Sequence, residues 1–351
     1  GVVAVAALLM AREGQRGQAH RGSPTLARTL ERRFKSLTLP LAARLLAPSR
    51  RTREAGSRPT PMRILVIRQD NRLGNLLLMS PFLRRLREAV PEARIAFLCG
   101  EVYAPLLRAW PWVDEWIVQE KRKQACMPWL FPPWLAGLRR REWNVAIEAS
   151  NHNTHSYYNC LLALASGAEE RVGFDHPRSR AALTRWVAPP TETVHFSLAP
   201  LALLRAMGWP AAAAPLQCPL PAPPSASLAT WLGREVGQAP CLVLHPGGRS
   251  SKAWPLTSWA ALLARLEEEW SGPLALIAGP EERERLRAIV ARASRVVAAP
   301  PLELNDLGHL LRSARALVGC DSGVMHLAVA LDTPTAALFS DQTRITMRPW
   351  G

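Results

Sequence analysis

The chain reads Ile64-Leu65-Val66-Ile67 and then Arg68-Gln69-Asp70-Asn71-Arg72-Leu73-Gly74-Asn75. Four consecutive apolar residues are typical of a parallel strand that is buried on both faces. The glycine then permits a tight turn into a helix that we expect to reach about Val90. A strand, a turn and a helix in this order predict the first unit of a doubly wound α/β domain.

The same alternation continues along the chain and restarts after a passage rich in proline and alanine, Trp209 to Pro224. Strands are expected at 94–98, 115–118, 145–147, 241–244, 274–277, 316–318 and 335–339, and helices at 257–270, 281–293, 305–313 and 323–331. This pattern predicts two Rossmann-like domains that face a central cleft. We expect a basic extension over 1–61, a first domain over 62–208, a linker region over 209–240 and a second domain over 241–351.

Composition limits the classes of function. Of the 351 residues, 48% are hydrophobic, which is enough for two cores and argues against a disordered chain. A net charge of +16 suggests an anionic partner, although a general bias towards arginine is the alternative. The sequence has no nucleic-acid recognition motif of the usual kinds, so nucleic acid is not expected as a partner. The six cysteines are scattered without a CxxC pair, and no metal site is expected.

The first 61 residues differ from the rest. One helix is expected over about 24–46, with leucines and Phe34 at helical spacing and basic residues between them. A basic amphipathic helix is typical of a membrane-surface anchor. The alternatives are a helix that packs on the catalytic domain or an upstream extension, because Met62 could be a start. The longest apolar run near the beginning, Val2 to Met10, is too short to cross a bilayer.

Three loops at the carboxyl ends of predicted strands carry the chemistry. In the first, Arg68, Arg72 and Gly74 precede helix amides that attract anions, although a structural turn is the simpler interpretation. The second has paired glycines, two hydroxyls and a cation suited to a diphosphate, namely Gly247, Gly248, Ser250, Ser251 and Lys252. Its spacing is not that of a Walker A loop.

The third loop runs from Gly319 to His326. Asp321 and Ser322 stand where a helix cap belongs, so a capped helix with a buried histidine is one interpretation. The other places Ser322 and Gly323 on a phosphate and Asp321 on a sugar. A further strand end carries Glu282, a carboxylate that could accept both hydroxyls of a ribose.

Taken together, these segments resemble glycosyltransferase family nine, the ADP-heptose:lipopolysaccharide heptosyltransferases. The resemblance runs from Met62 to the end of the chain and rests on ILVIR (64–68), RLGN (72–75), SPFLRRLRE (80–88), GAEERVGF (167–174), HPGG (245–248), KAWP (252–255), AGPEE (278–282) and the run 307–339.

The resemblance implies the GT-B fold and an inverting, metal-independent transfer of heptose from ADP-heptose, with no cofactor. It places Lys252, Ser322 and Gly323 at the diphosphate, Glu282 at the ribose and Asp321 at the heptose, with His326 nearby. The acceptor would be an anionic glycolipid such as a Kdo–lipid A core, held by the first domain. The enzyme would then be cytoplasmic, with peripheral contact at the inner face of the inner membrane.

One position departs from the family pattern. The family usually has a carboxylate, thought to be the general base, where this chain has Asn75, and an amide cannot take a proton at neutral pH. Asp70 in the same loop is a candidate replacement that would be worth about two to four orders of magnitude in kcat, or else it only caps the loop. His152 and His155 are the next candidates. The family also continues with a tail that packs on the first domain, so a sequence ending at Trp350-Gly351 looks incomplete.

Other activities remain open. A different GT-B enzyme, such as a UDP-sugar transferase or a nucleotide-sugar epimerase, would share the fold. A non-catalytic protein that binds a nucleotide sugar or a glycolipid would explain Asn75.

Overall fold

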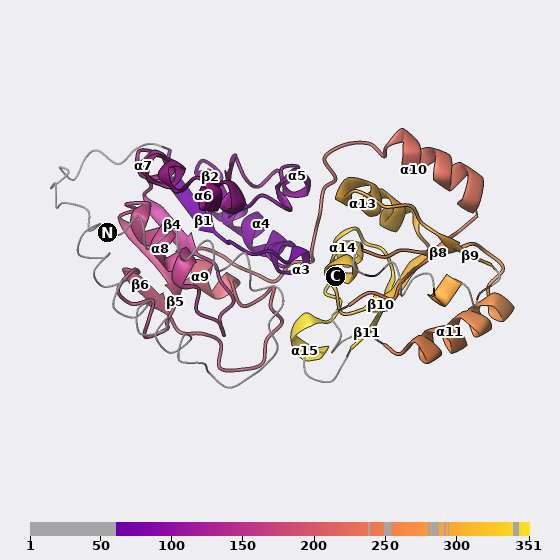
Figure 1. Ribbon diagram of the computed structural model, residues 1–351. Helices are drawn as coiled ribbons and strands as arrows, with labels where there is room; N and C mark the ends of the chain where they lie inside the picture. The colour runs from indigo at the N-terminus through magenta and orange to yellow at the C-terminus, as the bar shows by residue number, and fades with distance from the viewer. Residues whose placement is uncertain are drawn as a thin grey trace, which may run out of the picture.

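The computed structural model describes residues 61–237, 239–248, 254–279, 282, 288–290, 293, 295–339 and 344–351. The helix expected over 24–46, most of the helix expected over 281–293, and Ser250, Ser251 and Lys252 lie outside these residues. The described chain forms two α/β bodies that lie side by side (Figure 1).

The first body is built on a six-stranded parallel sheet with the order β3-β2-β1-β4-β5-β6. Its strands are β1 (Arg63–Ile67), β2 (Arg94–Gly100), β3 (Glu115–Gln119), β4 (Val145–Glu148), β5 (Glu170–Phe174) and β6 (Arg185–Val187). The central strand β1 is buried from Ile64 onward, as its apolar run predicts. The sequence pattern did not predict β5 and β6.

Helices cover this sheet on both faces (Figure 1). They are α3 (Leu73–Leu77), α4 (Ser80–Ala89), α5 (Ala104–Leu107), α6 (Lys121–Cys126), the 3-10 turn η2 (Pro128–Leu130), α7 (Phe131–Arg139), α8 (Tyr157–Ala165) and α9 (Leu201–Ala206). The single helix expected to follow the Gly74 turn and reach about Val90 was wrong, because Gly74 lies within a first short helix and the helix breaks at Leu78 and Met79. Pro81 has no amide hydrogen to continue the ladder, and it is tolerated at the start of a new helix.

The second body is a five-stranded parallel sheet with the order β11-β10-β7-β8-β9. Its strands are β7 (Leu242–His245), β8 (Leu274–Leu276), β9 (Val296–Ala298), β10 (Ala316–Cys320) and β11 (Thr335–Leu338). The helices are α10 (Ala226–Trp231), η3 (Leu232–Val236), α11 (Leu256–Glu269), α13 (Leu304–Ser313), α14 (Gly323–Ala330) and α15 (Arg344–Met347). These two doubly wound parallel sheets confirm the predicted pair of Rossmann-like domains.

The region 209–240 connects the two bodies. It leaves the first body as an extended chain and enters α10 at the outer edge of the second (Figure 1). The chain crosses back near its end, where Phe196 N donates to Thr346 O over 3.0 Å and Trp350 Nε1 donates to Ala214 O over 3.1 Å. Trp350 also stacks on His195, with 5.1 Å between the ring centroids.

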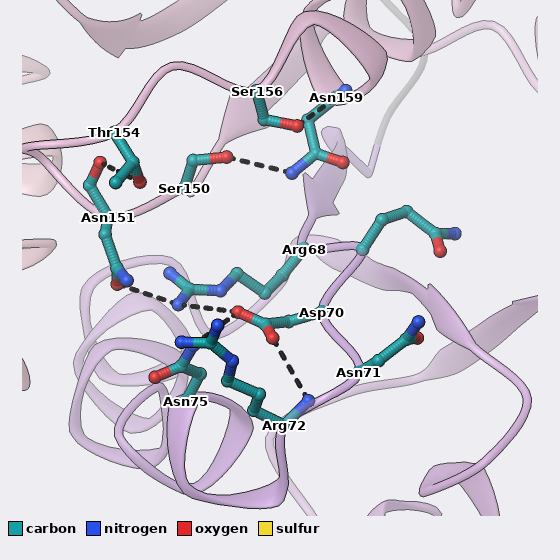
Figure 2. Close-up of a pocket in the computed structure, with 11 residues that line it drawn as sticks. Arg68, Asp70, Asn71, Arg72, Asn75, Ser150, Asn151, Thr154, Ser156 and Asn159 are labelled. Carbon is teal, nitrogen blue, oxygen red and sulfur yellow. Dashed lines mark hydrogen bonds and ion pairs between the residues drawn. The ribbon is translucent and has the colours of Figure 1, made fainter. Parts of the chain in front are cut away.

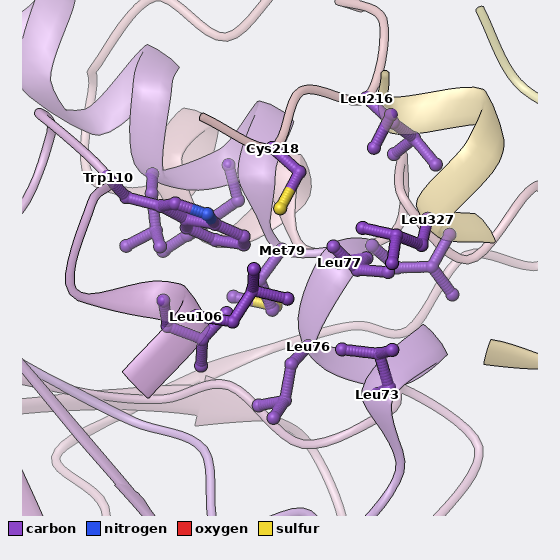
Figure 3. Packing of buried hydrophobic residues seen from close by; sticks show 14 of the residues in the cluster. Leu73, Leu76, Leu77, Met79, Leu106, Trp110, Leu216, Cys218 and Leu327 are labelled. Carbon is purple, nitrogen blue, oxygen red and sulfur yellow. The ribbon is translucent and has the colours of Figure 1, made fainter. Parts of the chain in front are cut away.

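The bodies meet at α3 and α14. Gly74 and Gly323 allow this approach: a Cβ built on Gly74 would lie 2.6 Å from His326 Cδ2, and one on Gly323 would lie 3.0 Å from Leu73 Cβ. Leucines of α3 continue into one buried cluster with Leu327 of α14 and with Leu216 and Cys218 of the connection (Figure 3). Apolar packing therefore holds the first loop of one domain against the third loop of the other.

No helix within the described ranges is long and apolar enough to cross a membrane.

Candidate functional site

A cavity of about 280 Å³ opens where β1 and β4 end (Figure 2). In parallel α/β sheets, ligands bind at this carboxyl edge, because strand ends and helix N-termini meet there. The residues that line it are all polar or charged, namely Arg68, Gln69, Asp70, Asn71, Arg72, Asn75, Ser150, Asn151, Thr154, Ser156 and Asn159. The first loop of the chain thus faces the loop that follows β4.

Arg68 ties these two loops together. Its guanidinium is 3% exposed and donates to Ala149 O over 2.5 Å and to Asn151 Oδ1 over 2.8 Å. It also pairs with Asp70 over 3.3 Å. Burial lowers the pKa of Arg68, and the negative charges of Asp70 and Glu148 oppose that shift. These hydrogen bonds are all directed to the protein, which gives Arg68 a role in shaping the pocket.

Asp70, the candidate base, and Asn75, which stands at the family's carboxylate position, are hydrogen-bonded to each other. Asn75 Nδ2 donates to Asp70 Oδ2 over 2.7 Å, and Arg72 N donates to Asp70 Oδ1 over 3.1 Å. The second bond closes a turn of the kind that aspartate favours two residues ahead of an amide. The bond from Arg72 N therefore supports the interpretation that Asp70 caps the loop. The Asp70 side chain also lines the pocket.

A second carboxylate, Glu148, lies behind the pocket wall at the end of β4. It is 5% exposed, and one of its oxygens accepts from both the backbone N and the hydroxyl of Ser150. Asn159 Nδ2 donates in turn to Ser150 Oγ over 2.9 Å (Figure 2). Burial raises the pKa of Glu148, and the bonds from Ser150, the charge of Arg68 and the bond from Asn159 act in the opposite direction.

The sequence interpretation missed this group. A glutamate at the end of the apolar run Val145 to Ile147 was the available signal, since it marks a charged side chain at the ligand-binding edge of a sheet.

His152 and His155 are not among the residues that line the cavity. The His152 ring packs edge-on against Phe174 and Phe196, and burial lowers its pKa. The His155 ring stacks on His176 with 4.7 Å between centroids.

The second body gathers its candidate donor residues around Glu282. Its carboxylate accepts from Gly248 N and Gly279 N, both over 2.9 Å, and lies 3.5 Å from His245 Nε2. Burial opposes its charge and is the largest single influence, but the bonds from His245 and the two amides outweigh burial and lower the pKa to about 2. Glu282 is therefore an anion at neutral pH and closes onto the glycine loop, where a side chain on Gly247 would collide with it.

Ser322 links this group to α14. Its hydroxyl lies 3.3 Å from His245 Nδ1 and caps the helix by accepting from Met325 N over 3.4 Å. Asp321 is buried beside it at the end of β10, and His326 is buried one turn into the helix, where its ring touches Gly74 of the first body. The structure thus brings together the loop at 245–248, Gly279, Glu282 and the segment 321–326. Among the described residues, no group of three or more His, Cys, Asp or Glu side chains is arranged to hold a metal ion.

Comparison with known proteins agrees with this architecture. The model of glycosyltransferase family 9 (heptosyltransferase) matches residues 136–351. Lipopolysaccharide heptosyltransferase 1 of Pseudomonas aeruginosa is 40% identical over 103 residues, a stretch that spans only 29% of either chain. The family match covers more than half of the present chain.

Two solved structures share the fold. A glycosyl transferase family 9 protein from Veillonella parvula superposes with a TM-score of 0.72 at 19% identity, over 82% of this chain and 84% of its own. The ADP-heptose lipopolysaccharide heptosyltransferase II of Escherichia coli gives a TM-score of 0.67 at 22% identity, over 82% and 88%. The fold is thus GT-B, and the chain belongs to glycosyltransferase family 9, the heptosyltransferase family.

Proposed function

We propose that this protein transfers heptose from ADP-heptose to a hydroxyl of a lipopolysaccharide core acceptor of the Kdo–lipid A type, with inversion and without a metal. Membership of the heptosyltransferase family supports the reaction class. The E. coli neighbour whose name specifies ADP-heptose supports the donor.

The observation that carries the proposal is the contact between α3 and α14. Asn75 lines the pocket of the first body, and its neighbour Gly74 touches His326 in the third loop of the second. A nucleotide sugar held by the second body at the N-terminus of α14 would present its sugar towards the pocket. This is the geometry that a direct transfer between two bound substrates requires.

The donor side carries groups suited to a nucleotide diphosphate. The amides of a helix N-terminus and a capping hydroxyl favour phosphate, and Ser322 and Gly323 supply both at α14. The ionised Glu282 would accept ribose hydroxyls, and Asp321 those of the heptose. Gly247, Gly248, Ser250, Ser251 and Lys252 would surround the diphosphate.

The acceptor side suits a charged sugar. The pocket is polar, and Arg72 at its mouth offers an exposed cation to an anionic glycolipid. A basic protein is attracted to the anionic lipids of a membrane surface. The net charge of +16 and a lipid-linked acceptor therefore both favour peripheral binding at the inner face of the inner membrane.

Calorimetry tests the donor assignment. ADP-heptose should bind more tightly than UDP-glucose. In a separate turnover assay, addition of EDTA should leave the rate unchanged. A preference for UDP-glucose would reject the heptosyltransferase assignment and leave the fold intact.

We expect Lys252→Ala to raise the donor KM and lower kcat, together by about tenfold to a hundredfold in kcat/KM, because a charge-assisted hydrogen bond to the leaving diphosphate is lost. Steady-state kinetics with varied ADP-heptose measures this. Lys123→Ala is the control, since that lysine lies on α6 and pairs with Glu120. Unchanged kinetics for Lys252→Ala would move the diphosphate site elsewhere.

A further inference from the structure

Transfer to a hydroxyl needs a group that accepts its proton, and the position that carries a carboxylate in the family is Asn75 here. The described pocket has one carboxylate on its surface, Asp70, and one directly behind its wall, Glu148. Asp70 already accepts from Asn75, Arg68 and Arg72. Glu148 accepts hydrogen bonds from the backbone N and the hydroxyl of Ser150, a residue that lines the pocket.

The hydrogen bonds fix the direction of that connection. A serine hydroxyl donates once and accepts twice. Ser150 Oγ donates to Glu148 and accepts from Asn159 Nδ2, so one acceptor position is left on the hydroxyl of this pocket-lining residue. An incoming hydroxyl can donate to that position while the serine proton points at the carboxylate.

Two pocket residues are also prepared for a ligand with hydroxyl groups. Asn159 is 2% exposed and its Oδ1 has no hydrogen-bond partner in the part of the chain that the structure describes. Gln69 Oε1, in the loop that follows β1, is also buried and has no hydrogen-bond partner among the described residues. Buried amide oxygens are nearly always satisfied, so two such acceptors on residues that line one pocket suit the hydroxyls of a sugar.

We propose that Glu148 accepts the proton of the acceptor hydroxyl through Ser150, while Asn159 Oδ1 orients that sugar; the inference rests on the function proposed above. The acceptor oxygen forms a bond to the anomeric carbon as the bond from that carbon to the ADP phosphate oxygen breaks. The acceptor proton passes to Ser150 Oγ as the serine proton passes to Glu148. ADP leaves with its electron pair, and Glu148 returns the proton to solvent after the product departs.

The surroundings of Glu148 fit this task. Burial raises its pKa and makes it a stronger proton acceptor than a surface carboxylate. The charged or titratable groups that face it are Arg68, which links it to Asp70, and the thiol of Cys160, whose pKa is itself raised well above the usual value by burial. Because Glu148 must be ionised to act, kcat should rise with pH through this raised pKa and then level off.

The test is the pH profile of kcat with ADP-heptose and a core acceptor. Glu148→Gln keeps an acceptor for Ser150 but cannot take a proton, so we expect kcat to fall by about two to four orders of magnitude and the acidic limb to disappear. Ser150→Ala should behave alike, and Ser150→Thr, which restores a hydroxyl, should recover most of the turnover. The ADP dissociation constant should not change in any of these variants.

The control is Glu170→Gln on the adjacent strand β5, where the carboxylate pairs with Arg185 outside the pocket. Suppose that the wild-type protein transfers heptose and that Glu148→Gln has the same kcat and the same acidic limb in its pH profile. That result would overturn this inference and leave the proposed function standing. A wild-type protein that transfers heptose to no acceptor would reject both.

Discussion

Asp70→Asn should lower kcat by about tenfold to a hundredfold, because a hydrogen bond to a charged partner, the buried guanidinium of Arg68, is lost. Arg68 would then have Glu148 as its remaining carboxylate and would stabilise that anion, so Glu148 would become a weaker proton acceptor. The acidic limb of the pH–kcat profile should therefore move to lower pH and persist. The measurement is kcat against pH at saturating substrates.

The alternative role of Asp70 makes a different prediction. If Asp70 were itself the proton acceptor, kcat would fall by about two to four orders of magnitude and the limb would vanish. Asp175→Asn is the matched control, because that partly exposed aspartate pairs with Arg180 and does not line the pocket. Full turnover in a well-folded Asp70→Asn enzyme would contradict both roles.

Gly74→Ala should destabilise the protein by about 1–3 kcal/mol, the usual cost of forcing an extra methyl into a packed interface. The new Cβ would lie 2.6 Å from Cδ2 of His326, a side chain that is 2% exposed and has little room to move. Since α3 carries Asn75 and follows the loop of Asp70, turnover should fall as well. Denaturant unfolding and steady-state kinetics measure the two effects.

Gly137→Ala provides the comparison. Gly137 also lies in a helix, α7, and a Cβ there would meet nothing within 4 Å. Helix propensity alone should make that variant more stable by about 0.5–1 kcal/mol. A Gly74→Ala protein as stable as Gly137→Ala would mean that the two helices do not pack as described.

Most strands that the sequence predicted contain a continuous apolar run, but β9 (Val296–Ala298), which is also apolar, was not predicted. β1 and β4 are buried on both faces, and so their composition alone identifies them. β5 escaped because it begins with Glu170 and Arg171. Arg171 is buried, and its guanidinium donates hydrogen bonds to Ala182 O and Ala168 O. No local sequence pattern reveals these bonds. The three-residue strand β6 is too short to carry a pattern.

The candidate site was predictable to a similar degree. Loops that follow strands were found because the carboxyl edge of a parallel sheet binds ligands, and they include Asp70, Asn75, Glu282 and Ser322. The pairing of Asp70 with Asn75 and the closure of Glu282 onto Gly248 depend on side-chain directions that sequence spacing does not fix. Glu148 was missed since its importance comes from Ser150 and Asn159, which are brought to it by α8 and the preceding loop.

The most direct test of the proposed reaction is incubation with ADP-heptose and a panel of truncated lipopolysaccharide cores, followed by mass spectrometry and NMR of the acceptor. We expect one heptose to be added to one class of core, with inverted anomeric configuration and release of ADP in equal amount. Binding of ADP-heptose without transfer to any core would contradict the account and make the protein a nucleotide-sugar binding protein on a transferase fold.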